Sequence, residues 1–242
     1  MNTKITLGVL TTLLPMTIFT AHASDTAVTN LNNLLKNTKS MTANFSQTTK
    51  TADRSQSFSG SMALERGHKF RWETKSPSEQ LIVVNGNTMW IYDKDLQQAT
   101  KQSVTSEVAD TPALLLSGDP NQIARNFSIS QPNKGKNYYV LKPKSNAANF
   151  RDLSISFNGG KPVMMVLNDS IGQTTSINFN NVNINKNIPA KEFSFTPPRG
   201  VDVINQWDSE TEHAKTAILD TTAILIENGG FWVWRFLGWC PL

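Results

Sequence analysis

Short extended segments joined by turn residues fill most of this 242-residue chain, and they most restrict the folds open to it. Asn85-Gly86 separates two such segments and is the strongest hairpin signal, and Asn158-Gly159-Gly160 marks a second hairpin. Many short strands with close turns favour one large antiparallel sheet, curved or partly closed. The expected strands are 43–49, 57–66, 69–73, 80–84, 88–92, 96–102, 126–130, 138–142, 150–157, 163–168, 172–184 and 192–196.

Helical patterns interrupt this series in two places. Apolar residues at helical spacing predict a helix over 25–39, capped by Ser24 or Asp25. Segment 110–118 is typical of a short inserted helix, and a further helical turn is expected after Asp119-Pro120. Because both helices have an apolar face and nothing else helical to pack on, we expect them to lie across one mouth of the sheet as a lid.

The first 23 residues have the pattern of a secretory signal peptide: a basic start, an apolar stretch and a small-residue cleavage site at Ala21-His22-Ala23. The alternative is a membrane span, but the apolar stretch is short and contains Pro15. We therefore expect export to the periplasm with cleavage before Ser24. The only cysteine is Cys240, so we expect no lipid anchor at the cleavage point and no internal disulfide.

The composition argues against an enzyme. Histidine occurs only at positions 22, 68 and 213, and His68 lies in a probable turn. We find no metal-ligand spacing, nucleophile elbow or phosphate-binding loop, so no cofactor or metal is expected. A paired-carboxylate hydrolase site stays open from sequence alone, although nothing points to one. The net charge of +4 is mildly basic, which suits an anionic partner surface. The basic residues are scattered along the chain, which argues against nucleic acid.

Large apolar side chains exceed what one sheet face needs. Individually, each is best interpreted as core. Together, they predict an interior under movable helices that is only filled when an apolar guest binds, and methionine suits such adaptable cavities. The residues predicted to line the cavity are Phe70, Trp72, Met89, Trp90, Leu114, Leu115, Leu141, Met165 and Phe179.

Segment 64–72, Leu-Glu-Arg-Gly-His-Lys-Phe-Arg-Trp, resembles the Arg-Pro-x-x-Phe-x-Trp motif of the outer-membrane lipoprotein carrier family, LolA. The resemblance continues through 79–92, 110–115 and 193–201, and its order and spacing extend over residues 24–206. No single motif is specific, but their combination is.

This resemblance implies an incomplete antiparallel β-barrel of about 11 strands, closed at one mouth by about three short α-helices and enclosing a hydrophobic cavity. It implies a monomeric periplasmic chaperone that accepts acylated lipoproteins from an inner-membrane ABC transporter and delivers them to an outer-membrane receptor. By position, Arg66 matches the family arginine that holds the lid shut, Phe70 the aromatic residue near the mouth, and Trp72 one facing the cavity.

Two residues depart from the family pattern. Gly67 replaces the usual proline after the arginine, which predicts a less rigid turn and weaker lid closure, and Asn85 replaces an acidic residue. From Trp207 the chain leaves the pattern altogether, so we expect domains at 1–23, 24–206 and 207–242. The apolar tail is either an interface-docking segment or, as we favour, an adventitious extension.

Two other functions remain open from sequence. A similar open barrel could sense lipid or lipoprotein stress by binding a regulatory protein, and it would then deliver nothing. A periplasmic hydrolase is the third possibility, and turnover of glycans or esters would reveal it.

Overall fold

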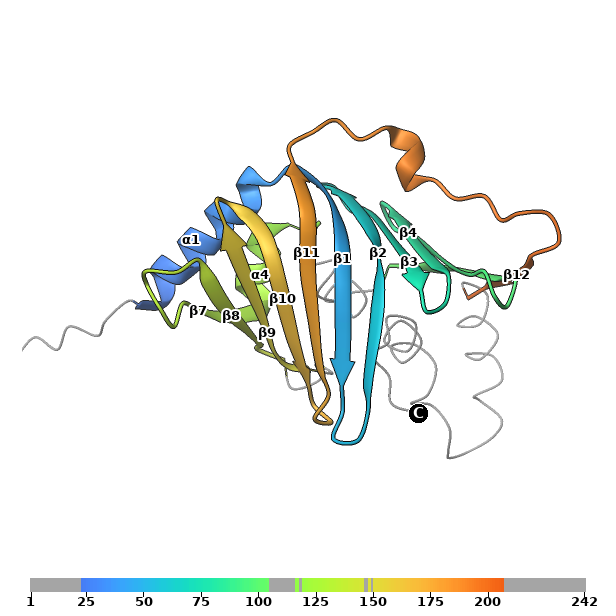
Figure 1. Cartoon of the computed structure of the whole chain (residues 1–242). Helices are drawn as coiled ribbons and strands as arrows, with labels where there is room; N and C mark the ends of the chain where they lie inside the picture. Colours follow the sequence, from blue (N-terminus) through green and yellow to red (C-terminus); the bar gives the residue numbers. More distant parts are fainter. Residues whose placement is uncertain (1–22, 105–115, 118, 146–147, 149, 207–242) are drawn as a thin grey trace, which may run out of the picture.

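One open sheet of 12 strands dominates the structure, a computed structural model that describes residues 23–104, 116–117, 119–145, 148 and 150–206 (Figure 1). The strand order is β12-β6-β5-β4-β3-β2-β1-β11-β10-β9-β8-β7, so β12 and β7 are the two edges. The strands are β1 Ser40–Lys50, β2 Ser55–Glu65, β3 Lys69–Ser76, β4 Gln80–Asn85, β5 Thr88–Asp93, β6 Gln98–Ser103, β7 Phe127–Ser130, β8 Tyr138–Pro143, β9 Phe150–Asn158, β10 Lys161–Asp169, β11 Thr174–Ile184 and β12 Asp202–Asn205.

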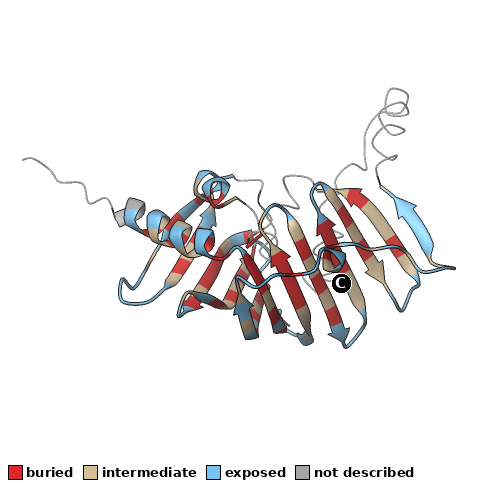
Figure 2. Ribbon diagram, turned by 90° about the horizontal axis from the view of Figure 1, so that it is seen from above, coloured by how far each residue is buried: buried red, intermediate tan, exposed pale blue. Residues whose placement is uncertain are grey.

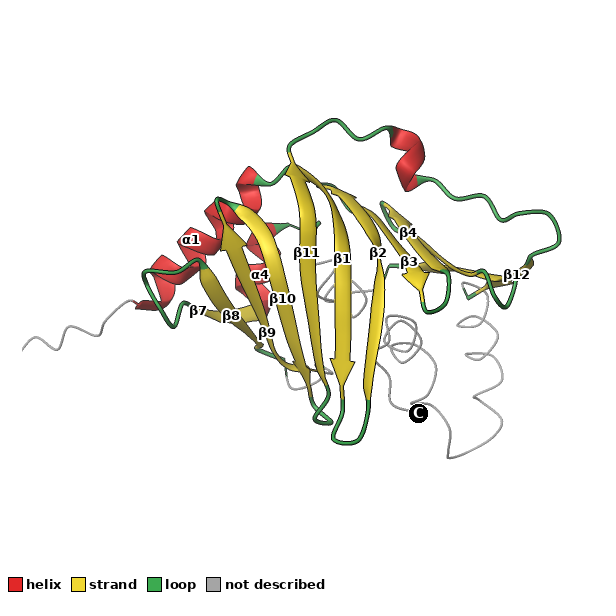
Figure 3. Cartoon of the chain, in the orientation of Figure 1, coloured by secondary structure: helices red, strands yellow, loops and turns green. Residues whose placement is uncertain are grey.

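Two α-helices and one 3-10 helix accompany the sheet in the described part of the chain (Figure 3). They are α1 Ala23–Asn37, α4 Pro120–Asn126 and η1 Ala190–Phe193. Asp119 caps α4 by accepting a hydrogen bond from the Asn121 backbone N–H at 2.9 Å. The helical turn expected after Asp119-Pro120 is thus confirmed. The helix expected over 25–39 is also present, but it begins at Ala23, so Ser24 and Asp25 lie in its first turn and do not cap it. The expected inserted helix, 110–118, lies almost wholly outside the described residues, apart from Leu116 and Ser117 in a turn.

The mainly β class and the open sheet are confirmed, and every expected strand up to 172–184 is present with slightly different ends. The expected strand 192–196 is wrong. Its apolar alternation comes from Phe193 and Phe195, which pack against the face of the sheet instead of pairing within it. A strand in a sheet and an extended segment lying across one bury alternate residues alike, so sequence periodicity does not separate them.

The final strand also differs from expectation. β12 pairs with β6 in parallel, joining Val203 to Ala99, so the sheet is not antiparallel throughout. The connection 185–201, here called the strap, crosses the sheet and brings the chain back to the start of β6 (Figure 1). All four residues of β12 are exposed, so it has no alternating burial pattern by which its sequence could announce it.

The two faces of the sheet are covered differently. We call the face packed against α1 and α4 the inner face, and the face crossed by the strap the outer face. Ala27, Leu31 and Leu35 of α1 join the inner-face residues in one apolar cluster. Phe193 of η1 joins Ala63 and Ile188 in a small cluster on the outer face. Buried residues recur strand after strand across the sheet (Figure 2).

Among the described residues, no helix has the length and apolar character needed to cross a membrane.

Candidate functional site

The inner face of the sheet is apolar over most of its width. Phe45 of β1 is opposite Phe179 of β11, and strand alternation places Met41 of β1 and Met62 and Leu64 of β2 on the same face. All of these residues belong to the apolar cluster that continues to β7 on one side and β5 on the other. A single continuous apolar surface of this kind, with α1 lying on it, is suited to contact hydrocarbon.

Aromatic stacking marks the centre of this surface. The ring centroids of Phe45 and Trp72 are 3.8 Å apart, and those of Phe70 and Trp72 are 6.1 Å apart. Gly60 is opposite Phe45 in the register of β1 and β2. A Cβ at Gly60 would lie 2.9 Å from a Phe45 ring carbon and 1.9 Å from the Glu73 carbonyl oxygen. Glycine is therefore required for the strands and the aromatic ring to approach this closely.

Arg66 joins the end of β2 to α1. Its Nη2 donates a hydrogen bond to the carbonyl oxygen of Leu35, in the last turn of the helix. The Thr38 N–H, just beyond the helix, also donates to this carbonyl oxygen at 3.0 Å, and the arginine cation opposes the negative end of the helix dipole. Burial lowers the pKa of Arg66 to about 10, and the nearby charge of Asp119 partly opposes this shift.

Asn185, just after β11, fixes the same helix end. Its side chain donates to the Asn37 carbonyl oxygen at 2.8 Å and accepts from the Lys39 N–H at 2.8 Å. Its positive φ of 59° is tolerated by asparagine better than by most residues. Sequence reasoning missed this contact, because a turn asparagine in an Asn-rich segment has no distinguishing pattern of its own.

The structure places six of the predicted cavity residues together. Each is buried on the inner face, at most 5% exposed, in the one apolar cluster: Phe70, Trp72, Met89, Leu141, Met165 and Phe179. Leu114 and Leu115 lie outside the described residues. The next residue, Leu116, is buried in the same cluster.

Trp90 does not face this surface. It alternates with the inward-facing Met89 and Ile91, so it points to the outer face. Its ring lies 5.5 Å from Phe195 of the strap, and the ammonium of Lys101 lies 5.5 Å from its centroid. The prediction that Trp90 lines the cavity is wrong, because neighbouring residues on a strand face opposite sides.

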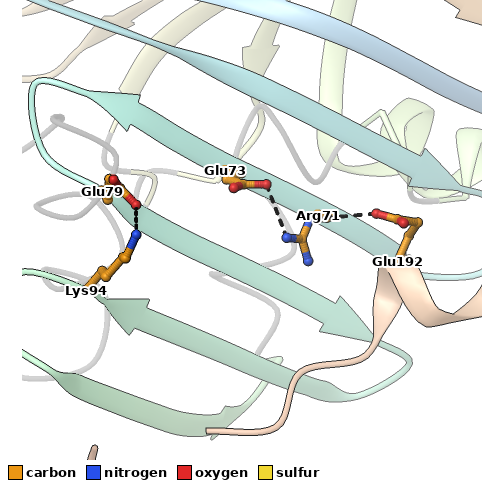
Figure 4. Close-up of polar contacts among 5 residues, drawn as sticks. All are labelled: Arg71, Glu73, Glu79, Lys94 and Glu192. Carbon is orange, nitrogen blue, oxygen red and sulfur yellow. Dashed lines mark hydrogen bonds and ion pairs between the residues drawn. The ribbon is translucent and has the colours of Figure 1, made fainter. Parts of the chain in front are cut away.

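Part of the outer face under the strap is polar. Arg71 Nη2 lies 3.1 Å from Glu73, and its Nε lies 4.0 Å from Glu192 of η1 (Figure 4). A pocket of about 450 Å³ separates the strap from β1, β2, β3 and β11 at this place, lined largely by amide and hydroxyl side chains. Lys94 also contacts Glu79 nearby, and this hydrogen bond raises the pKa of Lys94 (Figure 4).

Within the described ranges, no group of three or more His, Cys, Asp or Glu side chains is arranged to hold a metal ion. The inner face instead offers apolar contact, and at one end of it Arg66 is hydrogen-bonded to the last turn of α1. Such a surface can bind an apolar group.

Comparison with known proteins decides the family. The sequence profile of the family described as "Outer membrane lipoprotein carrier protein LolA" matches residues 36–196. This chain belongs to that family. The matched residues include Arg66, the inner-face aromatic residues and most of the sheet.

Several curated relatives of the family match over most of their length. An outer-membrane lipoprotein carrier protein from Pseudomonas paraeruginosa is 43% identical over 190 residues, which cover 77% of this chain and 91% of the relative. One from Azotobacter vinelandii is 42% identical over 189 residues, covering 77% and 91%. One from Legionella pneumophila (strain Lens) is 42% identical over 185 residues, covering 76% and 92%.

Two solved structures are similar at low sequence identity. A LolA superfamily protein from Nitrosomonas europaea is 10% identical with a TM-score of 0.45, covering 72% of this chain and 99% of the other. An uncharacterized conserved protein from Thermus thermophilus is 12% identical with a TM-score of 0.49, covering 75% and 99%.

Proposed function

We propose that this chain is a periplasmic carrier of lipoproteins that holds their acyl chains against the inner face of its sheet, beneath α1. One observation carries the proposal: the apolar cluster runs unbroken from β7 to β5 and includes the face of α1. Membership of the lipoprotein carrier family supports the cargo class. The residues proposed to contact the acyl chains are Phe70, Trp72, Met89, Leu114, Leu115, Leu141, Met165 and Phe179.

The proposal extends to partners and location. An inner-membrane ABC transporter supplies the lipoprotein, and a receptor on the outer membrane accepts it. The chain reaches the periplasm through its signal peptide, which is cleaved before Ser24. The chain catalyses no reaction, so direction comes from partners that bind the cargo better at each step.

Release requires that binding be weakened. Each buried methylene of an acyl chain contributes about 0.8 kcal/mol, so several chains together would bind too tightly to leave. In the structure, the inner apolar residues are already covered, and Arg66 holds the end of α1. Moving α1 aside breaks contacts, and this cost is subtracted from the gain on loading. Arg66 is therefore proposed to close the lid and set the affinity for cargo.

The test is release of an acylated lipoprotein from inner-membrane vesicles that contain the transporter and ATP. The purified protein should take up the acylated lipoprotein and leave behind a form without acyl chains. Phe70→Glu should abolish uptake, because it places a carboxylate on the inner face. Trp90→Glu is the matched control, since it places the same group on the outer face.

Circular dichroism would first establish that both variants are folded. Phe70→Leu, which keeps an apolar side chain, should retain uptake even where the glutamate variant is unstable. Equal release of lipoprotein with and without the wild-type protein would refute the carrier function.

A further inference from the structure

The inner face changes from apolar to polar along one side of the sheet, at the ends of several central strands. Five inward-facing positions there carry uncharged hydrogen-bonding side chains: Gln47, Thr49, Thr74, Gln80 and Thr175. Among the residues opposite them, Phe58 and Leu167 are apolar and Asp93 is acidic. Thr49 is opposite Thr175 in the β1–β11 register, and Thr74 is opposite Gln80 in the β3–β4 register. These residues lie where β1 and β3 end and where β4 and β11 begin. We call this set of five residues the polar edge. Arg66 lies at the opposite ends of the strands, where β2 ends.

Four of these five residues are buried and Gln80 is partly buried, which makes their polarity costly. Gln47 is 2% exposed, Thr49 5%, Thr175 1% and Thr74 8%. Further along the same strands, inward positions are apolar, as at Phe45, Trp72 and Ile177. A surface that contacted only hydrocarbon would gain from apolar side chains along its whole length, since buried polar groups require hydrogen-bond partners.

The polar edge offers both donors and an acceptor. The hydroxyls of Thr49 and Thr175 lie 3.1 Å apart, so one donates to the other and the pair retains a second hydroxyl proton. Gln47 Nε2 lies 3.5 Å from Thr49 Oγ1. Gln80 Oε1 is buried, and no donor among the described residues reaches it. A buried acceptor without a donor indicates a group that a ligand can satisfy.

We infer that the polar edge binds the ester and amide groups that join the acyl chains to the modified terminal cysteine of a lipoprotein. This inference rests on the proposed carrier function and adds the orientation of the cargo. Ester carbonyls accept hydrogen bonds from the threonine hydroxyls, and the N-acyl amide N–H donates to Gln80 Oε1. The five residues are uncharged, which suits esters and amides and gives a phosphate group no counter-charge.

The dimensions agree with this orientation. From Thr49 to Met41, β1 extends about 26 Å at the rise of a strand, whereas one leaflet of a bilayer core is about 15 Å thick. An acyl chain that starts at the polar edge can therefore extend along the apolar face toward α1. The protein part of the cargo leaves at the polar edge, away from Arg66.

A cycle between protein and ligand variants tests the assignment. The ligands are a synthetic triacylated lipopeptide and its analogue with ether links in place of the two esters, which lacks only the ester carbonyls. Wild-type protein should bind the ester form about threefold to tenfold more tightly than the ether form, as expected for a lost hydrogen bond. In Thr49→Val/Thr175→Val, this ratio should fall to about one.

Thr48→Val is the matched control, because Thr48 lies on β1 beside Thr49 and faces outward. It should keep the wild-type ratio. Gln80→Leu provides a second test that does not depend on the threonines. Wild-type protein should bind a lipopeptide with a free N-acyl amide N–H more tightly than its N-methylated form, and Gln80→Leu should remove this preference. Ratios unchanged in both inner variants would overturn the inference. A wild-type protein that binds neither lipopeptide would instead refute the carrier function itself.

Discussion

Arg66 donates a hydrogen bond from Nη2 to the Leu35 carbonyl oxygen, and this contact holds the last turn of α1 against the end of β2. The backbone N–H of Arg66 also donates to the Lys39 carbonyl oxygen at 2.9 Å, just beyond the helix. One residue thus fixes the helix end through both its side chain and its backbone. Only the side-chain contact is open to substitution.

Arg66→Leu should free the end of α1 without unfolding the sheet. Hydrogen bonds of a charged group contribute about 1.5–3 kcal/mol. Part of that gain is already offset by the cost of burying the guanidinium, as its pKa, lowered to about 10, indicates. We expect the midpoint of urea unfolding to change little, while amide hydrogen exchange accelerates in α1 and not in β1.

Arg66→Lys is the control for charge. Lysine keeps a cation near Asp119 but lacks the planar fork of donors. We expect exchange in α1 to be intermediate between wild type and Arg66→Leu. Exchange that is unchanged in Arg66→Leu would show that the side chain of Arg66 is not needed to hold the helix end.

Gly67→Pro, which restores the usual family residue, should destabilise this chain. Gly67 has a φ of 99°, whereas proline holds φ near −65°, so the turn between β2 and β3 is built in a conformation that proline cannot adopt. We expect a loss of about 1–3 kcal/mol in the free energy of unfolding. Chemical denaturation measures it, and Lys134→Ala, at an exposed position between β7 and β8, should stay near wild type.

The same φ bears on the expectation that Gly67 loosens the lid. The resemblance to the family motif implies only that proline is missing, and flexibility is the simplest consequence to draw. The backbone shows that glycine serves a specific conformation, and His68 beside it also has a positive φ, of 63°. Whether closure is weaker than in relatives stays a prediction, and the exchange rates of α1 address it.

The sequence was informative where local pattern and tertiary structure agree. Alternation and Asx-Gly turns located the strands from β1 to β11, because most of them are half-buried and are joined to the next strand by a short turn. Burial could also be anticipated for Phe70 and Met165. Which face Trp90 occupies depends on register, and a shift of one residue reverses every side chain.

Long-range contacts escaped the sequence for a different reason. The path of the strap depends on the contacts of Phe193 and Phe195 with strands that are distant in the sequence, and no local sequence pattern indicates these contacts. The contact of Asn185 with α1 joins residues 148 apart. The polar edge likewise becomes visible only when Thr49 and Thr175 are found opposite each other.

Phe193, more than the ion pair beside it, should hold the strap to the sheet. Its side chain is 1% exposed. The side chains of Arg71 and Glu192 are 22% and 41% exposed, and 4.0 Å separates Arg71 Nε from Glu192 Oε2. Phe193→Ala should cost about 3–5 kcal/mol, and Glu192→Gln less than about 1 kcal/mol. Urea unfolding of both variants measures the difference. A larger loss in Glu192→Gln would mean that the ion pair dominates.

Trp72 should report cargo binding and Trp90 should not, because they lie on opposite faces of the same sheet. Trp72 is 2% exposed beside Phe45 on the inner face, and Trp90 contacts Phe195 on the outer face. Two single-tryptophan proteins are needed, with every other tryptophan, including the four from Trp207 onward, replaced by phenylalanine. A lipopeptide with brominated acyl chains should strongly quench the fluorescence of Trp72 and leave that of Trp90 nearly unchanged, since bromine quenches only at close range. The unbrominated lipopeptide controls for conformational change, and far-ultraviolet circular dichroism confirms that both proteins are folded. Equal quenching of the two tryptophans would place the acyl chains somewhere other than the inner face, because the ring of Trp90 points away from that face and contacts Phe195.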